Sequence, residues 1–233
     1  MFFIHEICTP TRVDENKNLK LFSAFQMIND CCDMWFDSEP VLKKYFHEKN
    51  KTQMATFRQV DIIRVPKMGE VLTISTSLYR CEKYFGFRND IIRDEQGNPC
   101  YLSNSMGVGI DLNTNKLDTL PPEILQTLTF DKMYDMEYKN RKIRLPKIEP
   151  TEMPMYKVMR NDIDYNHHMN NCQYIRIALE MIPSDFSPKS VRVEYKTPAK
   201  LDDELTPLLY PIDDVYCVVL KCGEATAAIL EFV

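Results

Sequence analysis

Three polar residues stand at alternate positions in one segment of the chain: Asp164, Asn166 and His168. Their types suit the hydrolysis of an acyl bond. An imidazole can activate water as a general base near neutral pH. A carboxamide can donate a hydrogen bond to a developing oxyanion, and a carboxylate can orient either neighbour. Residues spaced by two share one face of an extended segment, so we expect the three side chains to lie together.

The same segment directly precedes an apolar helix that is predicted to begin at Asn170 or Asn171. A helix start offers free N–H groups and the positive end of the helix dipole. Asn and Asp before a helix are also what an N-terminal cap requires. The residues alone therefore leave two interpretations open, a cap and an active site. Metal binding at His167 and His168 is disfavoured because neighbours on a strand point to opposite faces, and the chain has no Gly-x-Ser-x-Gly elbow.

The composition limits the classes of protein to consider. The chain has 233 residues, of which 29 are basic and 34 acidic, with 44% hydrophobic residues. These values exclude a disordered tail, a collagen and a coiled-coil rod, and the acidic excess argues against nucleic-acid binding. The eight cysteines form no Cys-x-x-Cys pair, so we predict reduced thiols, no metal or other cofactor, and a cytoplasmic location. The chain lacks the basic, apolar start of a signal peptide, and no run approaches the roughly 18 apolar residues of a membrane span.

The spacing of apolar residues predicts the helices and strands that must position these three residues. In the first half, the pattern predicts a helix over 19–35 and a short one over 41–46, then strands over 54–65, 71–79, 85–93 and 99–110 with a hairpin turn at 94–98. In the second half it predicts a helix over 171–182, stopped by Pro183, and strands over 191–195, 216–221 and 225–233.

A connection over 121–154 joins the two halves and contains five of the 14 prolines. The order of elements is the same in both halves, and Lys200–Thr206 resembles Lys67–Thr73, which indicates an internal duplication with a period of roughly 130 residues. We therefore predict an α+β fold of two units, each a helix wrapped by an antiparallel sheet. The predicted boundaries are 1–140 for the first unit, 141–153 for a linker and 154–233 for the second.

The segment Asp164-x-Asn166-x-His168-x-Asn170-Asn171 resembles the signature of the acyl-ACP thioesterases, enzymes that release fatty acids from acyl carrier protein. Supporting similarity covers nearly the whole chain, including Arg64–Glu70, Phe87–Asp90, Gly109–Asp111 and Leu179–Pro183. The resemblance implies a tandem hotdog fold, in agreement with the duplication. It also implies hydrolysis of acyl-ACP to a free fatty acid, which ends chain elongation in fatty acid biosynthesis.

The resemblance assigns roles to the three residues. His168 matches the catalytic histidine, Asn166 the asparagine that positions and supports the oxyanion, and Asp164 the aspartate that holds the constellation. The sequence departs from the family where an acidic residue, followed by cysteine in plants, is expected after the strand. Pro198 and Ala199 stand there, and Glu194 and Glu204 are the candidate substitutes. This departure disfavours a covalent cysteine mechanism and makes single-step attack by water the simpler hypothesis.

Two further features concern the substrate. The first helix offers an apolar slot for the acyl chain from Phe22, Phe25, Met27, Met34 and Trp35. The basic run Lys139, Arg141, Lys142, Arg144 and Lys147 could guide an acidic carrier protein, and a solvated linker is the alternative. Two other functions stay open, an acyl-CoA thioesterase and a non-catalytic protein that binds acyl chains or carrier protein. The sequence also leaves open a homodimer.

Overall fold

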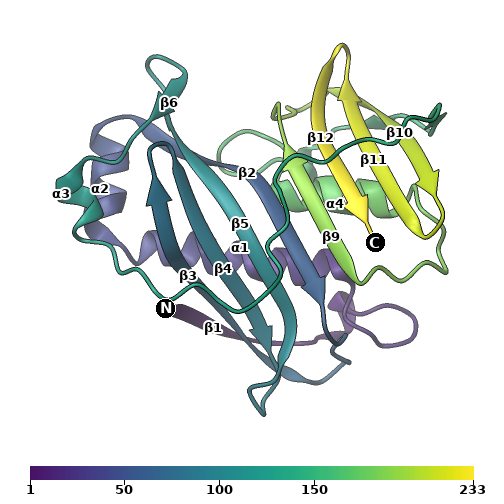
Figure 1. Cartoon of the computed structure of the whole chain (residues 1–233), viewed down its shortest axis with the longest axis horizontal. Helices are drawn as coiled ribbons and strands as arrows, with labels where there is room; N and C mark the ends of the chain where they lie inside the picture. The colour runs from purple at the N-terminus through teal and green to yellow at the C-terminus, as the bar shows by residue number, and fades with distance from the viewer. The chain divides into compact units, whose positions relative to one another are not determined.

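The computed structural model describes residues 1–233, and its contacts divide the chain into two compact units (Figure 1). The first consists of residues 1–56 and 62–138, and the second of residues 57–61 and 139–233. Each unit contains one principal helix and an antiparallel sheet. No helix has both the length and the hydropathy needed to cross a membrane.

The strands of the first unit are β1 (Phe2–Ile7), β2 (Lys51–Ile62), β3 (Val71–Glu82), β4 (Phe85–Arg93), β5 (Pro99–Asp111) and β6 (Lys116–Asp118). They form a sheet in the order β1-β3-β4-β5-β2, and β6 pairs with β5. The helices are α1 (Leu21–Asp37), α2 (Pro40–Glu48) and α3 (Pro122–Leu125), preceded by a 3-10 turn at Pro10–Arg12. Helix α1 crosses the far face of these strands in Figure 1 and buries Phe25, Ile28 and Cys31. The Cys31 thiol donates to the backbone oxygen of Ile74 on β3 (3.4 Å), which ties the helix to the sheet.

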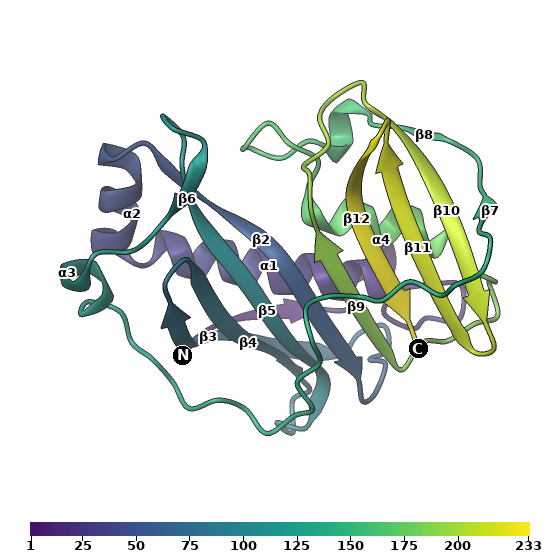
Figure 2. The same ribbon diagram turned by 45° about the horizontal axis from the view of Figure 1, so that its top comes forward.

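The second unit repeats this plan with shorter elements. Its strands are β7 (Thr151–Glu152), β8 (Tyr156–Lys157), β9 (Ser190–Tyr195), β10 (Glu204–Ile212), β11 (Val215–Cys222) and β12 (Ala225–Phe232). Residues 57–61 of β2 pair with β9, which continues through β12 and β11 to β10. Helix α4 (Asn171–Leu179) follows a 3-10 turn at Arg160–Asp162 and lies behind β12 and β11 in Figure 2. It buries Tyr174, Ile175 and Ala178. The α+β prediction is confirmed in both units.

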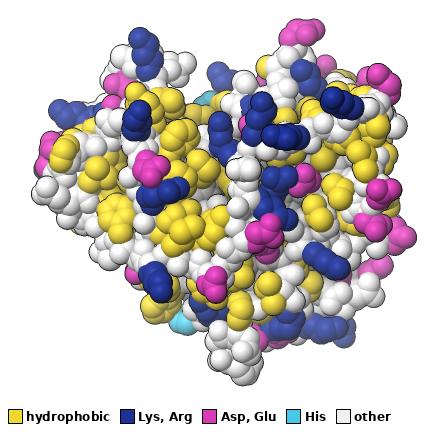
Figure 3. Space-filling view, in the orientation of Figure 1, with side chains coloured by type: hydrophobic (Ala, Val, Ile, Leu, Met, Phe, Trp, Pro, Cys, Tyr) yellow, Lys and Arg dark blue, Asp and Glu magenta, His cyan; other side chains and the backbone are white.

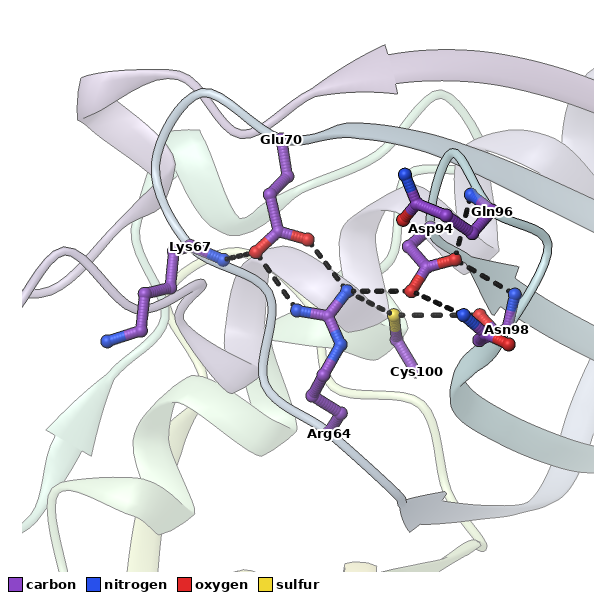
Figure 4. A network of polar contacts seen from close by, with 7 residues as sticks. All are labelled: Arg64, Lys67, Glu70, Asp94, Gln96, Asn98 and Cys100. Atoms are coloured by element: carbon purple, nitrogen blue, oxygen red, sulfur yellow. Dashed lines mark hydrogen bonds and ion pairs between the residues drawn. The ribbon is translucent and has the colours of Figure 1, made fainter.

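The two units share local contacts as well as element order. In the first, Glu70 accepts a hydrogen bond from the backbone N–H of Lys67 (2.7 Å). In the second, Asp203 accepts one from the N–H of Lys200 (2.8 Å). The Arg64 guanidinium reinforces the first of these turns, because it binds both oxygens of Glu70 and one of Asp94 (Figure 4). The similarity between Lys67–Thr73 and Lys200–Thr206 therefore corresponds to one turn used twice.

Several boundaries differ from the predictions. Helix α4 ends at Leu179 rather than Ile182, because its last turn tightens: the N–H of Glu180 bonds to Ile177 and that of Met181 to Ala178. Pro183 further disfavours helical geometry at the residue before it. Strands β1 and β10 were not predicted. Strand β10 contains Pro207, and its pairing with β8 and β7 is interrupted at that residue, which lacks the N–H a continuous ladder needs.

The connection between the units has few regular elements, as its proline content predicts. Its first part is held by the Asn89 side chain, whose oxygen accepts bonds from the Tyr134 N–H (3.0 Å) and the Tyr138 hydroxyl (2.9 Å). Farther along, Ile143 is buried on the outer side of the second sheet with Cys217, Val219 and Ile229. The segment around Ile143 is therefore fixed to the second unit.

Candidate active site

The loop that carries His168 is a tight turn between the 3-10 turn and α4, and its ends form an isolated bridge between Ile163 and Met169. The Asp164 N–H bonds to the His168 oxygen (2.9 Å), and the His167 N–H bonds to the Asp164 oxygen (3.0 Å). His167 has a φ of 61°, in the left-handed region. The prediction of an extended segment with three residues on one face is therefore wrong, because backbone bonding across the turn replaces strand geometry.

The Asp164 carboxylate binds the main chain of this loop. Its Oδ1 accepts a hydrogen bond from the Asn166 N–H (2.8 Å) and a longer one from the His168 N–H (3.5 Å). The side chain of Asn166 is exposed and that of His168 is half-buried, and neither makes a side-chain hydrogen bond within the chain. The three predicted residues thus share one loop without forming a hydrogen-bonded triad, and the imidazole and the amide are both free to meet a ligand.

The cap of helix α4 and the loop that carries His168 are formed by different residues. The Asn170 side chain accepts a hydrogen bond from the Cys172 N–H (2.9 Å) and caps α4. The Met169 N–H bonds to the Ala199 oxygen (2.8 Å), and the Ala199 N–H bonds to the Tyr174 hydroxyl oxygen (2.9 Å). Burial raises the pKa of Tyr174 to about 12, so the phenol stays neutral. Ala199 therefore supports the loop through its backbone, although its side chain has no acid–base chemistry.

The two candidate replacements for the acidic residue expected after the strand are Glu194 and Glu204. Glu194 is buried and accepts bonds from the Lys196 ammonium (3.1 Å) and the Ile143 N–H (3.3 Å). Glu204 is exposed at the start of β10, where its backbone pairs with Lys157. Neither carboxylate bonds to His168. Six of the eight thiols are also poorly suited to nucleophilic attack, because burial raises their pKa values, that of Cys8 to about 11 and that of Cys217 to about 12.

The first unit contains a copy of the loop that the sequence analysis did not recognise. Asp14 Oδ1 accepts bonds from the N–H groups of Asn16 (2.9 Å) and Asn18 (2.8 Å), and Lys17 has a φ of 63°. The Asp14 N–H bonds to the Asn18 oxygen (2.8 Å), as Asp164 does to His168. The spacing Asp-x-Asn-x-Asn was the available signal. Asn18 occupies the position of His168, so this copy has no general base.

The first unit also contains an apolar cavity of about 100 Å³. Its lining includes Trp35, Leu42, Phe46, Leu78 and Leu128. The guanidinium of Arg88, another lining residue, stacks on the Trp35 ring at 3.6 Å. Of the five residues predicted to form an acyl slot, Trp35 lines this cavity.

The other four have different positions. Phe25 and Met27 are buried in the core, Phe22 is half-buried and Met34 is exposed. The helical spacing located the apolar face of α1 and could not separate core residues from those that line a cavity.

Two family models match this chain, and they follow one another along the sequence in the same order as its two units. The N-terminal domain of acyl-ACP thioesterases matches residues 8–128, and the C-terminal domain matches residues 146–215. The chain belongs to the acyl-ACP thioesterase family. Asp164, Asn166 and His168 all lie within the matched C-terminal domain.

A curated relative and two solved structures extend this result. Over 164 residues the chain is 27% identical to oleoyl-acyl carrier protein thioesterase 1, chloroplastic, of Arabidopsis thaliana. The match covers 64% of this chain and 45% of the plant protein, less than half of its length. An acyl-ACP thioesterase from Bacteroides thetaiotaomicron has a TM-score of 0.88 at 18% identity, covering 99% of this chain and 96% of that one. The 12:0-ACP thioesterase from Umbellularia californica has a TM-score of 0.85 at 16% identity, covering 99% and 95%.

These structural matches extend over both units and confirm the tandem hotdog fold expected from the sequence. In this family member, each hotdog unit has one principal helix, α1 or α4, against its own antiparallel sheet. The fold accounts for the repeated turns and loops as parts of a duplicated unit.

Proposed function

We propose that this chain is a thioester hydrolase that releases free fatty acid from acyl carrier protein and so ends fatty acid chain elongation. The observation that carries the proposal is the half-buried imidazole of His168, which has no side-chain partner and stands just before α4 in the C-terminal domain of this family. An imidazole without a partner can take a proton from water as the water attacks an acyl carbon.

The reaction needs three contributions from the loop. His168 takes a proton from the attacking water and returns it to the carrier sulfur as the acyl C–S bond breaks, which gives the free acid and the carrier thiol. The exposed amide of Asn166 donates to the oxyanion that forms on the thioester oxygen. Asp164 acts on the main chain, because its carboxylate holds the N–H groups of both residues. The raised pKa values of six of the eight thiols disfavour these six as nucleophiles, which supports direct attack by water.

The substrate has two parts, and the chain has a feature suited to each. The cavity lined by Trp35, Leu42 and Phe46 has the apolar character that a fatty acyl chain requires. In the basic run, Arg141, Lys142, Arg144 and Lys147 are exposed and make no ion pair. Figure 3 shows Lys and Arg side chains gathered on the face over which this connection runs in Figure 1. Unpaired cations of this kind attract an acidic carrier protein.

One observation favours a second candidate, a hotdog protein that binds acyl carrier protein without hydrolysis. Pro198 and Ala199 stand where the family supplies an acid, and neither Glu194 nor Glu204 bonds to His168. We place this second to hydrolysis because the imidazole is present and unpaired. We also propose a cytoplasmic location, which the eight free cysteines support.

The test is free-thiol release from acyl-ACP and acyl-CoA substrates with chains of C4 to C18. The decisive variant is His168→Asn, because the first unit holds Asn18 at the same position of the same loop, so the loop accepts this residue. The matched control is His167→Asn, one residue away. Hydrolysis of acyl-ACP that is lost in His168→Asn and kept in His167→Asn supports the proposal. Activity on acyl-CoA alone would instead indicate an acyl-CoA thioesterase, and binding of acyl-ACP without turnover would indicate the second candidate.

A further inference from the structure

A polar network built around one buried carboxylate lies at the base of the His168 loop. The Asp162 carboxylate, only 4% exposed, accepts hydrogen bonds from the Tyr156 hydroxyl (2.7 Å), the Met159 N–H (2.8 Å) and the Arg176 guanidinium (2.9 Å). Arg176 also donates to the Tyr156 oxygen (2.7 Å) and to the Gln173 side chain (2.6 Å). Every side-chain oxygen of this network accepts a hydrogen bond. The negative charge of the buried Asp162 carboxylate is therefore balanced by the Arg176 guanidinium and by hydrogen bonds.

The network joins three elements that flank the loop. Tyr156 lies on β8, Asp162 ends the 3-10 turn, and Arg176 lies in the middle of α4. The backbone oxygen of Asp162 also accepts the Asn170 N–H (2.7 Å), which closes the loop at its base. The position of His168 relative to the start of α4 therefore depends on where Asp162 is held.

The copy of the loop in the first unit shows what the loop alone requires. Arg12 occupies the position of Asp162, and its backbone oxygen accepts the Lys20 N–H (3.0 Å). Its side chain forms a half-exposed pair with Glu6 (2.8 Å), with 31% and 30% of the two side chains accessible. The same backbone loop thus forms without a buried carboxylate. In the second unit the Asp162 side chain is 6% accessible and that of its partner Arg176 is 34% accessible. Burial of this carboxylate costs desolvation energy that the loop itself does not require, so we expect the network to have a role beyond construction of the loop.

We propose that Asp162, Arg176 and Tyr156 form a positioning network for His168, a role that rests on the proposed hydrolytic function. None of the three touches the substrate. Together they fix the loop base to α4, so that the imidazole is held at one distance and angle for proton transfer. A misplacement of about 1 Å in such a group can lower a rate on the order of 100-fold.

The test compares Arg176→Gln, Asp162→Asn and the milder Tyr156→Phe with the wild type. We expect kcat for acyl-ACP to fall about 10- to 100-fold in Arg176→Gln and less in Tyr156→Phe, with KM changed by less than about threefold. Arg176→Lys keeps the charge and should restore part of the loss. The matched control is Glu6→Gln, which breaks the corresponding pair in the first unit and should leave kcat unchanged. Thermal unfolding of each variant separates lost positioning from lost folding.

A second measurement does not depend on turnover. The chain has four histidines, so their ring signals can be followed by NMR in each variant. We expect the His168 ring signals to shift or broaden in Arg176→Gln while those of His5 and His47 in the first unit stay in place. Unchanged His168 signals, or unchanged kcat in a folded Arg176→Gln, would overturn the positioning role. If the wild type hydrolyses no thioester, the proposed function fails, and the ring signals still decide whether the network positions His168.

Discussion

Asp14 and Asp164 lie in different units of the chain, and each accepts hydrogen bonds from the backbone N–H groups two and four residues ahead. One of the two loops ends in His168 and the other in Asn18. Because each aspartate accepts from the same two backbone positions, with and without the histidine, these bonds belong to the construction of the loop. The histidine is the feature that separates a loop with a general base from one without.

This relationship predicts how Asp164 variants behave. Asp164→Ala removes the acceptor of both N–H groups and should lower kcat more than 10-fold, with a loss of about 1 kcal/mol in the free energy of unfolding. Asp164→Asn keeps an acceptor oxygen and should retain most of the activity. Asp14→Ala should lower the unfolding free energy by a similar amount and leave kcat unchanged. Steady-state kinetics and thermal unfolding check all three, and a large activity loss in Asp164→Asn would show that the negative charge itself is needed.

The two adjacent histidines should differ sharply. His168→Asn should lower kcat by roughly 10²–10⁴, the contribution expected of a general base. His167→Asn should have little effect, since His167 occupies the left-handed position of the turn, which Asn adopts readily. Steady-state kinetics on acyl-ACP, with the two variants assayed side by side, check this difference. Equal losses in both variants would point to damage of the loop rather than loss of a base.

Thiol reagents should have little effect on hydrolysis. Burial raises the pKa of Cys8 to about 11 and of Cys217 to about 12, and it also raises the pKa values of Cys31, Cys81, Cys100 and Cys222. These thiols are therefore protonated near pH 7.5 and react slowly. Incubation of the folded protein with iodoacetamide should preserve thioester hydrolysis, while the denatured chain should be labelled at eight sites. Rapid inactivation that acyl-ACP prevents would instead argue for a cysteine nucleophile.

The turn held by Arg64 should make stability depend on acidic pH. The hydrogen bond from Arg64 lowers the pKa of Glu70 below its ordinary value of 4.5. A lowered carboxyl pKa contributes stability that is present above pH 4.5 and disappears as pH falls through the pKa of the folded state. Both side chains are partly exposed, so Arg64→Gln should cost about 0.5–1 kcal/mol at pH 7. The difference in melting temperature between wild type and Arg64→Gln should shrink below pH 4.5, and a constant difference would rule out the Glu70 contribution.

The sequence predicted most of the fold because both principal helices and the central strands bury regular apolar faces. Strand β4 (Phe85–Arg93) has the predicted bounds, and the repeat of Lys67–Thr73 at Lys200–Thr206 marks a real structural repeat. The sequence could not give the shape of the His168 loop. A spacing of two residues is typical of a strand. Here the Asp164 carboxylate instead accepts a hydrogen bond from the backbone N–H of Asn166, and the segment forms a turn.

The sequence also could not predict the network of Tyr156, Asp162 and Arg176. Asp162 and Arg176 are 14 residues apart and belong to different elements, so no local pattern joins them. Their partnership depends on the tertiary placement of α4 beside the 3-10 turn. The predicted roles of Asp164, Asn166 and His168 stay predictions, and the variants above address those of Asp164 and His168. The predicted domain boundaries also stay predictions.

The basic segment should control recognition of the carrier protein. Arg141, Lys142, Arg144 and Lys147 are exposed without ion pairs, while Ile143 between them is buried and anchors the segment. The double variant Arg141→Glu/Lys142→Glu should lower kcat/KM for acyl-ACP by about 10-fold or more at low salt, and the difference should diminish as salt screens the charges.

An uncharged acyl-N-acetylcysteamine thioester should be hydrolysed equally by the wild type and by this double variant, since it has no carrier to attract. The control Lys44→Glu/Lys49→Glu makes the same change in net charge at exposed positions of the first unit. If both double variants lose the same kcat/KM for acyl-ACP, net charge alone steers the carrier. If neither loses any, the carrier docks elsewhere, and the basic segment is a solvated connection held in place by Ile143.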